Sequence, residues 1–356
     1  MKKILLLFSL PAAVLIVIQL IESCTTNNNH EKAVKSEFQF REKLSDYAFF
    51  KSPLNTLQPQ TALIKYQLQT ALFSDYAVKD RFIYLPANTR AQYQADGVLG
   101  FPDSTIIIKN FAYTNPAHRK VMIETRLLVK DPYDSQWKVM NYLWNAEQTD
   151  ALKHIAGAKV PITLLDEEGK ETLTNYYVPN TNDCKRCHTN NSVLSPIGPK
   201  ARNLNFTISG EPDNQLIHWA KADKLSGLPA IGKVSILPDW RDSVHYSLSQ
   251  RARAYLDINC AHCHTKGGDA YNSGLFLEYQ QSDSLHLGFY KYPVAAGGGA
   301  GGLENDILPG DAAHSIMVYR MNSIEPGTAM PELGRSMIHK EGVELVRNWI
   351  TSMKKK

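Results

Sequence analysis

Cysteine is scarce in this chain, and long runs of one charge sign are missing. Only five of the 356 residues are cysteine, and each of them can be assigned to a motif. Lysine and arginine number 39 and aspartate and glutamate 35, so the formal charge is +4, and the only basic run is three lysines at 354–356. This balance argues against a nucleic-acid partner. With 43% hydrophobic and 21% charged residues, the composition is that of an ordinary globular protein.

The N-terminal residues predict export. Lys2 and Lys3 precede an apolar run at positions 4–21, which is the layout of a secretory signal peptide. The run has roughly 18 residues, so an uncleaved membrane anchor is the alternative. The segment from Leu20 to Cys24 resembles a bacterial lipobox. We therefore expect a lipoprotein signal peptide over residues 1–23, lipidation of Cys24 and a polar tether over residues 24–45. The protein is then held by its lipid at a bacterial membrane, in the periplasm or at the outer membrane.

The other four cysteines form two pairs, each with two residues between the cysteines and a histidine directly after. The members are Cys184, Cys187 and His188 in the first motif and Cys260, Cys263 and His264 in the second. Two thiols three positions apart can each add to a vinyl group of one porphyrin, and the adjacent histidine then ligates its iron. Two such motifs predict two covalently attached haem c groups, with His188 and His264 as proximal ligands.

Three other uses of these cysteines were weighed. Structural disulfides suit an exported protein but give no reason for the two histidines. Zinc ribbons place their second pair about 15–20 residues after the first, whereas Cys187 and Cys260 are 73 positions apart. Thiol–disulfide oxidoreductases place the pair at a helix start after a buried strand, which the residues before Cys184 and Cys260 do not indicate.

The distal iron ligands are less directly indicated. Met330 precedes a proline in a loop ahead of the last predicted helix, and it is our candidate for the second iron. No methionine lies between His188 and His264, so the first iron needs a different ligand. His218 is the candidate that we prefer. The alternatives are His245, a methionine from the preceding region (Met122 or Met140), or an open sixth position.

Periodicity divides the mature chain into three regions. Residues 46–180 contain short runs rich in valine, isoleucine, tyrosine and tryptophan separated by turn residues, which predicts antiparallel strands. Residues 181–244 form a first haem-binding region, and residues 245–356 contain helical apolar stripes before Cys260 and at the C-terminus. We expect an α+β multidomain protein, with an antiparallel β-rich domain followed by mainly α-helical cytochrome c-like haem domains.

The motifs and several flanking segments resemble an uncharacterised family of exported dihaem c-type cytochromes with an N-terminal β-rich region. Residues 245–356 resemble the small monohaem cytochrome c fold, in which a methionine of the loop before the last helix binds the iron. The segments that carry the family resemblance are residues 123–128, 143–151, 198–205, 251–256 and 329–333. This resemblance implies haem binding and electron transfer, and it implies no particular substrate or partner.

The sequence is compatible with three functions. The leading one is one-electron transfer between redox proteins of the periplasm or outer membrane, which makes the chain an electron carrier rather than an enzyme. A dihaem peroxidase that uses an open first haem is the second. In the third, the β-rich region docks a dehydrogenase or binds a substrate, and the polar residues of its ordered segments are the candidates: Lys109, Glu124, Arg126, Glu147 and Asp150.

Overall fold

A computed structural model describes residues 36–165, 171–294 and 296–355. The predicted signal peptide, the lipidated Cys24 and the first part of the tether lie outside these residues. The segment Glu37–Lys356 forms one compact unit. No helix among the described residues combines the length and the apolar character that crossing a membrane requires.

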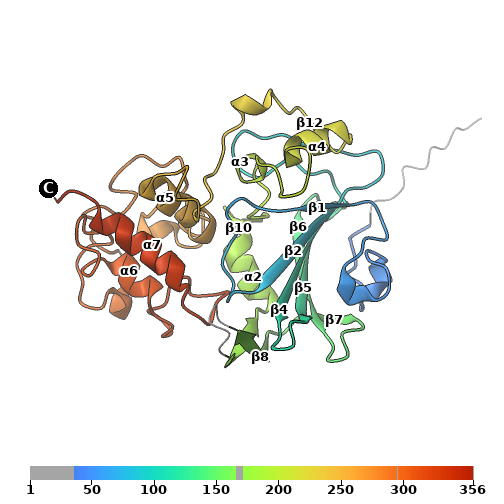
Figure 1. The fold of residues 1–356 in the computed structure, drawn as a ribbon, viewed down its shortest axis with the longest axis horizontal. Helices are drawn as coiled ribbons and strands as arrows, with labels where there is room; N and C mark the ends of the chain where they lie inside the picture. Colours follow the sequence, from blue (N-terminus) through green and yellow to red (C-terminus); the bar gives the residue numbers. More distant parts are fainter. Residues whose placement is uncertain (1–35, 166–170, 295, 356) are drawn as a thin grey trace, which may run out of the picture. The chain divides into compact units, whose positions relative to one another are not determined.

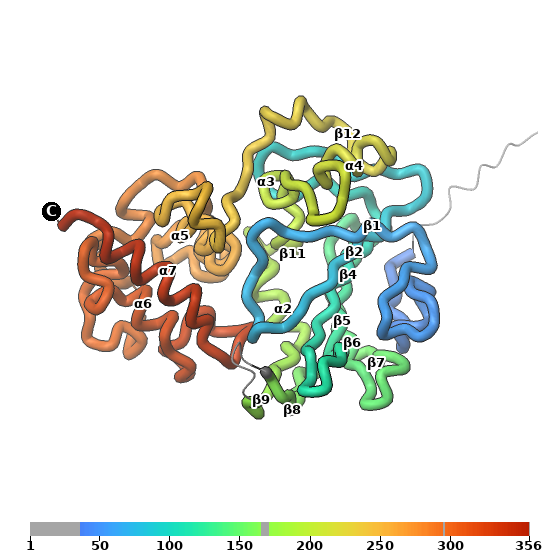
Figure 2. The backbone as a smooth tube through the Cα atoms, in the orientation of Figure 1, coloured from blue at the N-terminus to red at the C-terminus, as the bar shows by residue number. Residues whose placement is uncertain are grey.

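A six-stranded antiparallel sheet forms the first half of this unit (Figures 1 and 2), with its strands in the order β1-β2-β4-β5-β6-β7. Its strands are β1 (Leu63–Tyr66), β2 (Val78–Tyr84), β4 (Ile106–Thr114), β5 (Lys120–Lys130), β6 (Trp137–Trp144) and β7 (Ala151–His154). β8 (Ala158–Leu165) and β9 (Glu171–Val178) form a separate hairpin. The short strands are β3 (Ala91–Gln92), β10 (Thr189–Asn190), β11 (Val193–Leu194) and β12 (Leu225–Ser226).

The two faces of the sheet bury different parts of the chain, because side chains alternate along each strand. Leu127 and Val129 of β5 point into a core completed by the N-terminal residues Leu44 and Phe50. Leu128 points the other way, into a core shared with segments that follow the first motif. The sheet therefore supports the first motif with one face only.

The described part of the chain has six α-helices. They are α2 (Thr181–His188), α3 (Ala201–Leu204), α4 (Gln215–Lys221), α5 (Leu248–Asn259), α6 (Ile316–Met321) and α7 (Lys340–Thr351). The 3₁₀ turns are η1 (Ser45–Tyr47), η2 (Leu54–Thr56), η3 (Ile231–Lys233), η4 (Tyr271–Ser273) and η5 (Gly297–Ala300). The last three helices share one core that contains Leu256, Val318 and Val346, and they lie together in Figures 1 and 2.

The fold class predicted from the sequence is wrong. The chain is β-rich with 21% helix, and mainly α-helical cytochrome c-like domains do not follow the sheet. Among the described residues between Cys260 and α7, the six-residue α6 is the only α-helix, and the others form loops and 3₁₀ turns. The physical reason lies in composition: this stretch is rich in glycine, which costs about 1 kcal/mol in a helix interior, and it lacks a sustained helical repeat. The predicted boundaries after residues 180 and 244 stay predictions.

A buried ion pair joins the segment after the first motif to the helix before the second. The Arg202 guanidinium on α3 donates to both carboxylate oxygens of Asp257 on α5, at 2.7 and 3.0 Å. Their side chains are 5% and 0% exposed, so water does not screen the pair. Asp257 also accepts from the backbone N–H of Tyr279. Removing one partner leaves the other buried and unpaired, which typically costs about 3–5 kcal/mol.

We expect Asp257→Leu to lower the free energy of unfolding by about that amount, because it leaves the Arg202 charge without a partner. The double variant Arg202→Met with Asp257→Leu is expected to recover most of the loss. Lys221→Met, which breaks the exposed pair of Lys221 with Asp213, is the control and is expected to cost less than about 1 kcal/mol. Urea unfolding measures all three. Equal losses in Asp257→Leu and in the control would contradict the assigned role.

Candidate cofactor site

The first motif lies on the short helix α2. Asn180 caps its N-terminus in a capping box with Asp183, which starts the helix directly after β9. Cys184 is buried in the core under the sheet, and its thiol donates to Asn141 Oδ1 of β6 at 3.8 Å. Cys187 lies one turn later on the same helix. The residues before Cys184 did not indicate a helix start after a strand, whereas α2 follows β9 and begins three residues before Cys184.

His188 has the protonation state of a metal ligand. Its Nδ1 lies 2.9 Å from the Ser195 carbonyl oxygen, and a carbonyl only accepts, so Nδ1 carries the proton and Nε2 keeps a free lone pair. Burial lowers the pKa of His188 to about 4, so the ring is neutral at pH 7. Metal-binding histidines are commonly held in this way, with the second ring nitrogen bonded to an oxygen.

The second motif follows α5 directly and repeats this arrangement. A capping box of Ser247 and Gln250 starts α5, and Cys260 is its C-cap residue. His264 Nδ1 lies 3.2 Å from Ser273 Oγ, whose own proton is donated to the Ala270 carbonyl. Nδ1 is therefore the donor here too, and Nε2 keeps its lone pair. Burial lowers the pKa of His264 to about 4.

A cavity of about 340 Å³ surrounds the second motif. This volume falls within the range of small-molecule sites, about 300–1,000 Å³. Cys260, Cys263 and His264 form part of its wall, and three methionines, Met317, Met321 and Met330, form another part. A group with two thioether attachments and an axial histidine and methionine fits this donor set.

The cavity at the first motif is smaller, about 80 Å³. Cys184, Cys187 and His188 line it, but its volume is well below what a porphyrin requires. The donor set at the first motif therefore fits a haem. The volume of this cavity fits one only if side chains along its wall move. Cys187, Cys260, His262 and Met330 line both cavities, so the two sites share a wall.

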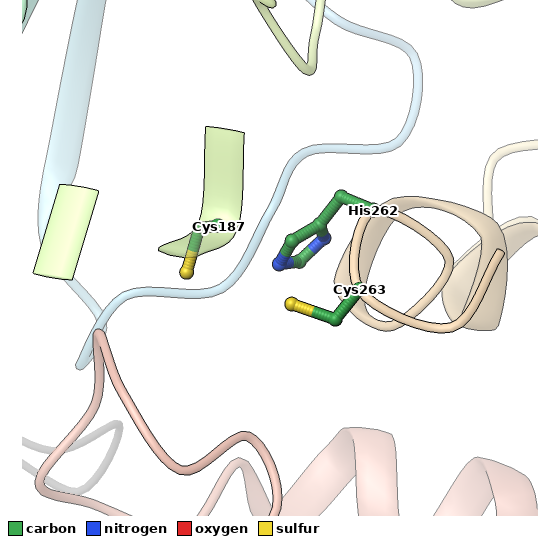
Figure 3. Close-up of side chains that lie close together, drawn as sticks. All are labelled: Cys187, His262 and Cys263. Atoms are coloured by element: carbon green, nitrogen blue, oxygen red, sulfur yellow. The ribbon is translucent and has the colours of Figure 1, made fainter. Parts of the chain in front are cut away.

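The two motifs meet at this shared wall (Figure 3). The side-chain donor atoms of Cys187, His262 and Cys263 lie within 4.8 Å of one another, and all four motif cysteines are free thiols. His262 Nδ1 is buried without a hydrogen-bond partner among the described residues. The distance in sequence between the motifs, which argued against a shared metal, does not keep them apart in space.

Polar contacts also hold the two motifs together. Arg186 of the first motif donates to Asp269 Oδ2 at 2.9 Å and to Glu332 Oε2 at 3.1 Å. The hairpin that follows the first motif packs on the loop after the second, where Asn191 N–H donates to the Gly267 carbonyl. Gly267 has φ +80°, and an added Cβ would lie 2.3 Å from Asn191 Oδ1. Glycine is therefore required at this contact.

Other sequence candidates lie away from the cavities. His218 is exposed on α4 and lines neither cavity. His245 is exposed and bonds to Asp242. Met122 is buried in the core on the opposite face of the sheet. The sequence analysis did not single out His262, although its position inside the second motif was a usable signal.

Comparison with known proteins adds no assignment: no family model matches the chain, and neither a curated protein nor a solved structure matches it.

Proposed function

We propose that the chain is an exported dihaem c-type cytochrome that transfers single electrons between redox proteins of the bacterial periplasm or outer membrane, with a lipid anchor on Cys24. The observation that carries the proposal is common to both motifs. Each histidine holds its Nδ1 proton on an oxygen and keeps Nε2 free beside two thiols. Disulfide formation gives no reason for this arrangement to occur twice, and the candidate metal cluster of the two motifs contains neither His188 nor His264. When bound, each haem supplies an iron that changes oxidation state by one electron.

The residues around the second motif have separate tasks in this proposal. Cys260 and Cys263 would attach the group, His264 and Met330 would ligate its iron, and Leu277 with other apolar residues would limit the access of water. A histidine–methionine ligand pair and an apolar surrounding both raise the reduction potential. The Met330 backbone carbonyl accepts from Arg335, which fixes the loop that carries the methionine.

For the first iron we propose His262 in place of His218 as the distal ligand. The cavity at the first motif contains two further histidines, His262 and His339. His339 Nδ1 is bonded to the Tyr255 hydroxyl at 2.9 Å, and its Nε2 lies 3.5 Å from Glu341 Oε2. His262 has a buried, unpartnered Nδ1 instead. Of these two histidines, His262 is the one with a ring nitrogen that has no hydrogen-bond partner among the described residues.

The cluster of Cys187, His262 and Cys263 favours one other function, a metal-ion site shared by both motifs. Two thiolates and an imidazole are donors that zinc accepts. The two functions exclude each other, because a thiol bonded to a porphyrin is not available to zinc. They therefore differ in what remains bound to the chain after unfolding.

We expect the mature chain, produced with cytochrome-maturation enzymes, to retain two haems after denaturation. Cys184→Ser with Cys187→Ser is expected to retain one, and so is Cys260→Ser with Cys263→Ser, because each thiol pair holds its own group. The absorbance of the denatured protein measures haem per chain. Cys24→Ser is the control and is expected to keep two haems while losing the lipid.

The metal site would be established instead by two results together: the chain carries no covalent haem and binds one zinc, and the His262→Ala variant does not bind zinc. In the haem-loaded protein, His262→Ala is expected to keep both haems and to give one ferric iron a high-spin absorption spectrum. His218→Ala is the matched control and is expected to leave the spectrum unchanged. The reverse result for these two variants would restore the original assignment of His218.

We expect Met330→Ala to abolish the sulfur-to-iron absorption band and to lower the higher of the two reduction potentials. Met337→Ala is the control, because Met337 lies in the same loop and lines neither cavity. A redox titration followed by optical spectra measures both. Loss of the band in Met317→Ala with retention in Met330→Ala would move the ligand to α6.

A further inference from the structure

A row of polar side chains crosses the sheet on the face that bears the first motif. Arg81 of β2 pairs with Lys109 of β4, Lys109 with Arg126 of β5, and Arg126 with Asn141 of β6. Direct cross-strand partners point to the same face, so these four side chains form one line. Apolar cores lie on both sides of the row, one containing Ile107 and the other Phe111. Within the row, Arg81 and Asn141 are buried, and Lys109 and Arg126 are half-buried.

Positive charge dominates this row. Arg81, Lys109 and Arg126 are joined on the same face by Lys79, two residues before Arg81. The buried acid beside them is Glu124, whose carboxylate is already bonded to Arg126 and to the Tyr176 hydroxyl. The Lys109 ammonium lies 4.7 Å from the centre of the Phe111 ring and has no hydrogen-bond or ion-pair partner among the described residues.

Burial makes these charges expensive. It lowers the pKa of Lys109 well below its usual value and the pKa of Lys79 to about 7, and the neighbouring guanidinium groups lower both further. A cation buried without a partner typically loses its proton or acquires a counter-ion. Arginine keeps its proton, so a row of this kind is stable with an anion next to it.

The row faces the first motif. Lys109 and Arg126 line the same cavity as Cys184, Cys187 and His188. Asn141, the next residue in the row, accepts the hydrogen bond from the Cys184 thiol. A group attached at the first motif is therefore in reach of the row, and so is a small anion that enters the cavity.

We infer that Lys109 and Arg126 form a carboxylate-binding site beside the first motif. The carboxylate has two possible sources, a propionate of the first haem or a free small dicarboxylate. Binding of a haem propionate rests on the proposed function, because it requires a haem at the first motif. Binding of a free dicarboxylate does not. In both cases Lys109 donates from an ammonium that the carboxylate keeps charged, and Arg126 donates through the guanidinium edge that Glu124 leaves open.

The test uses Lys109→Met, with Lys65→Met as its matched control. Lys65 is exposed on β1 and pairs with Phe82, so it lies on the opposite face of the same sheet. The haem-loaded proteins are compared by redox titration, by redox-difference infrared spectra and by thermal unfolding with and without succinate. If Lys109→Met does not fold, Lys109→Gln replaces it, because the amide retains hydrogen-bond donors.

If the propionate is bound, Lys109→Met shifts a carboxylate infrared band and lowers the potential of the first haem, because the lost cation leaves more negative charge near the iron. The second potential stays unchanged, and succinate has no effect. If a free carboxylate is bound, succinate raises the midpoint of unfolding in the wild type and in Lys65→Met but not in Lys109→Met.

The inference is overturned if Lys109→Met changes neither the infrared band nor the response to succinate. Failure of the proposed function is a separate result, seen as a denatured chain without haem. In that case thermal unfolding with succinate still tests the row.

Discussion

The approach of the two motifs is the constraint on which the rest of the structure depends. Cys187 and Cys263 are far apart in sequence, yet their donor atoms lie in one cluster with His262. A buried ion pair, Arg202 with Asp257, fixes α5 against the segment after the first motif. Asp75, in the loop before β2, accepts from the backbone N–H groups of Ser336 and Met337 and so fixes the loop that leads to α7. These long-range contacts hold the second motif and the sheet together in one unit.

The residues of each motif could be predicted from the sequence, and the contacts between the two motifs could not. The spacing of cysteines and histidines predicted which residues border the two cavities. This spacing depends only on neighbours along the chain. The meeting of Cys187 with His262 depends on contacts between residues tens of positions apart, for which the sequence has no periodic signal. His218 was chosen for its place on a helix, and the fold turns that position to solvent.

The wrong fold class has the same origin. Apolar stripes before Cys260 and at the C-terminus correctly indicated α5 and α7, whose cores meet. The inference that helices also fill the stretch between them came from the resemblance. That stretch instead satisfies its backbone with 3₁₀ turns and with side-chain bonds such as Arg253 to the carbonyls of Glu278 and Gln281. Long loops of this kind are stable only because buried side chains bond their backbone.

Burying charge on the sheet costs free energy, and folding alone gives no compensating gain. A core of apolar residues at the positions of Arg81, Lys109 and Arg126 would fold at least as well, since buried ion networks seldom add stability. Lys109 and Arg126 border the cavity of the first motif, whereas the opposite face of the same strands is packed with Phe82, Ile108 and Leu127. Buried positive charge on the face that meets the motif is expected where charge has a functional task. In the proposed cytochrome, such a row would place positive charge near the first iron and favour its reduced state, so the sheet itself would contribute to the potential at which that site accepts an electron.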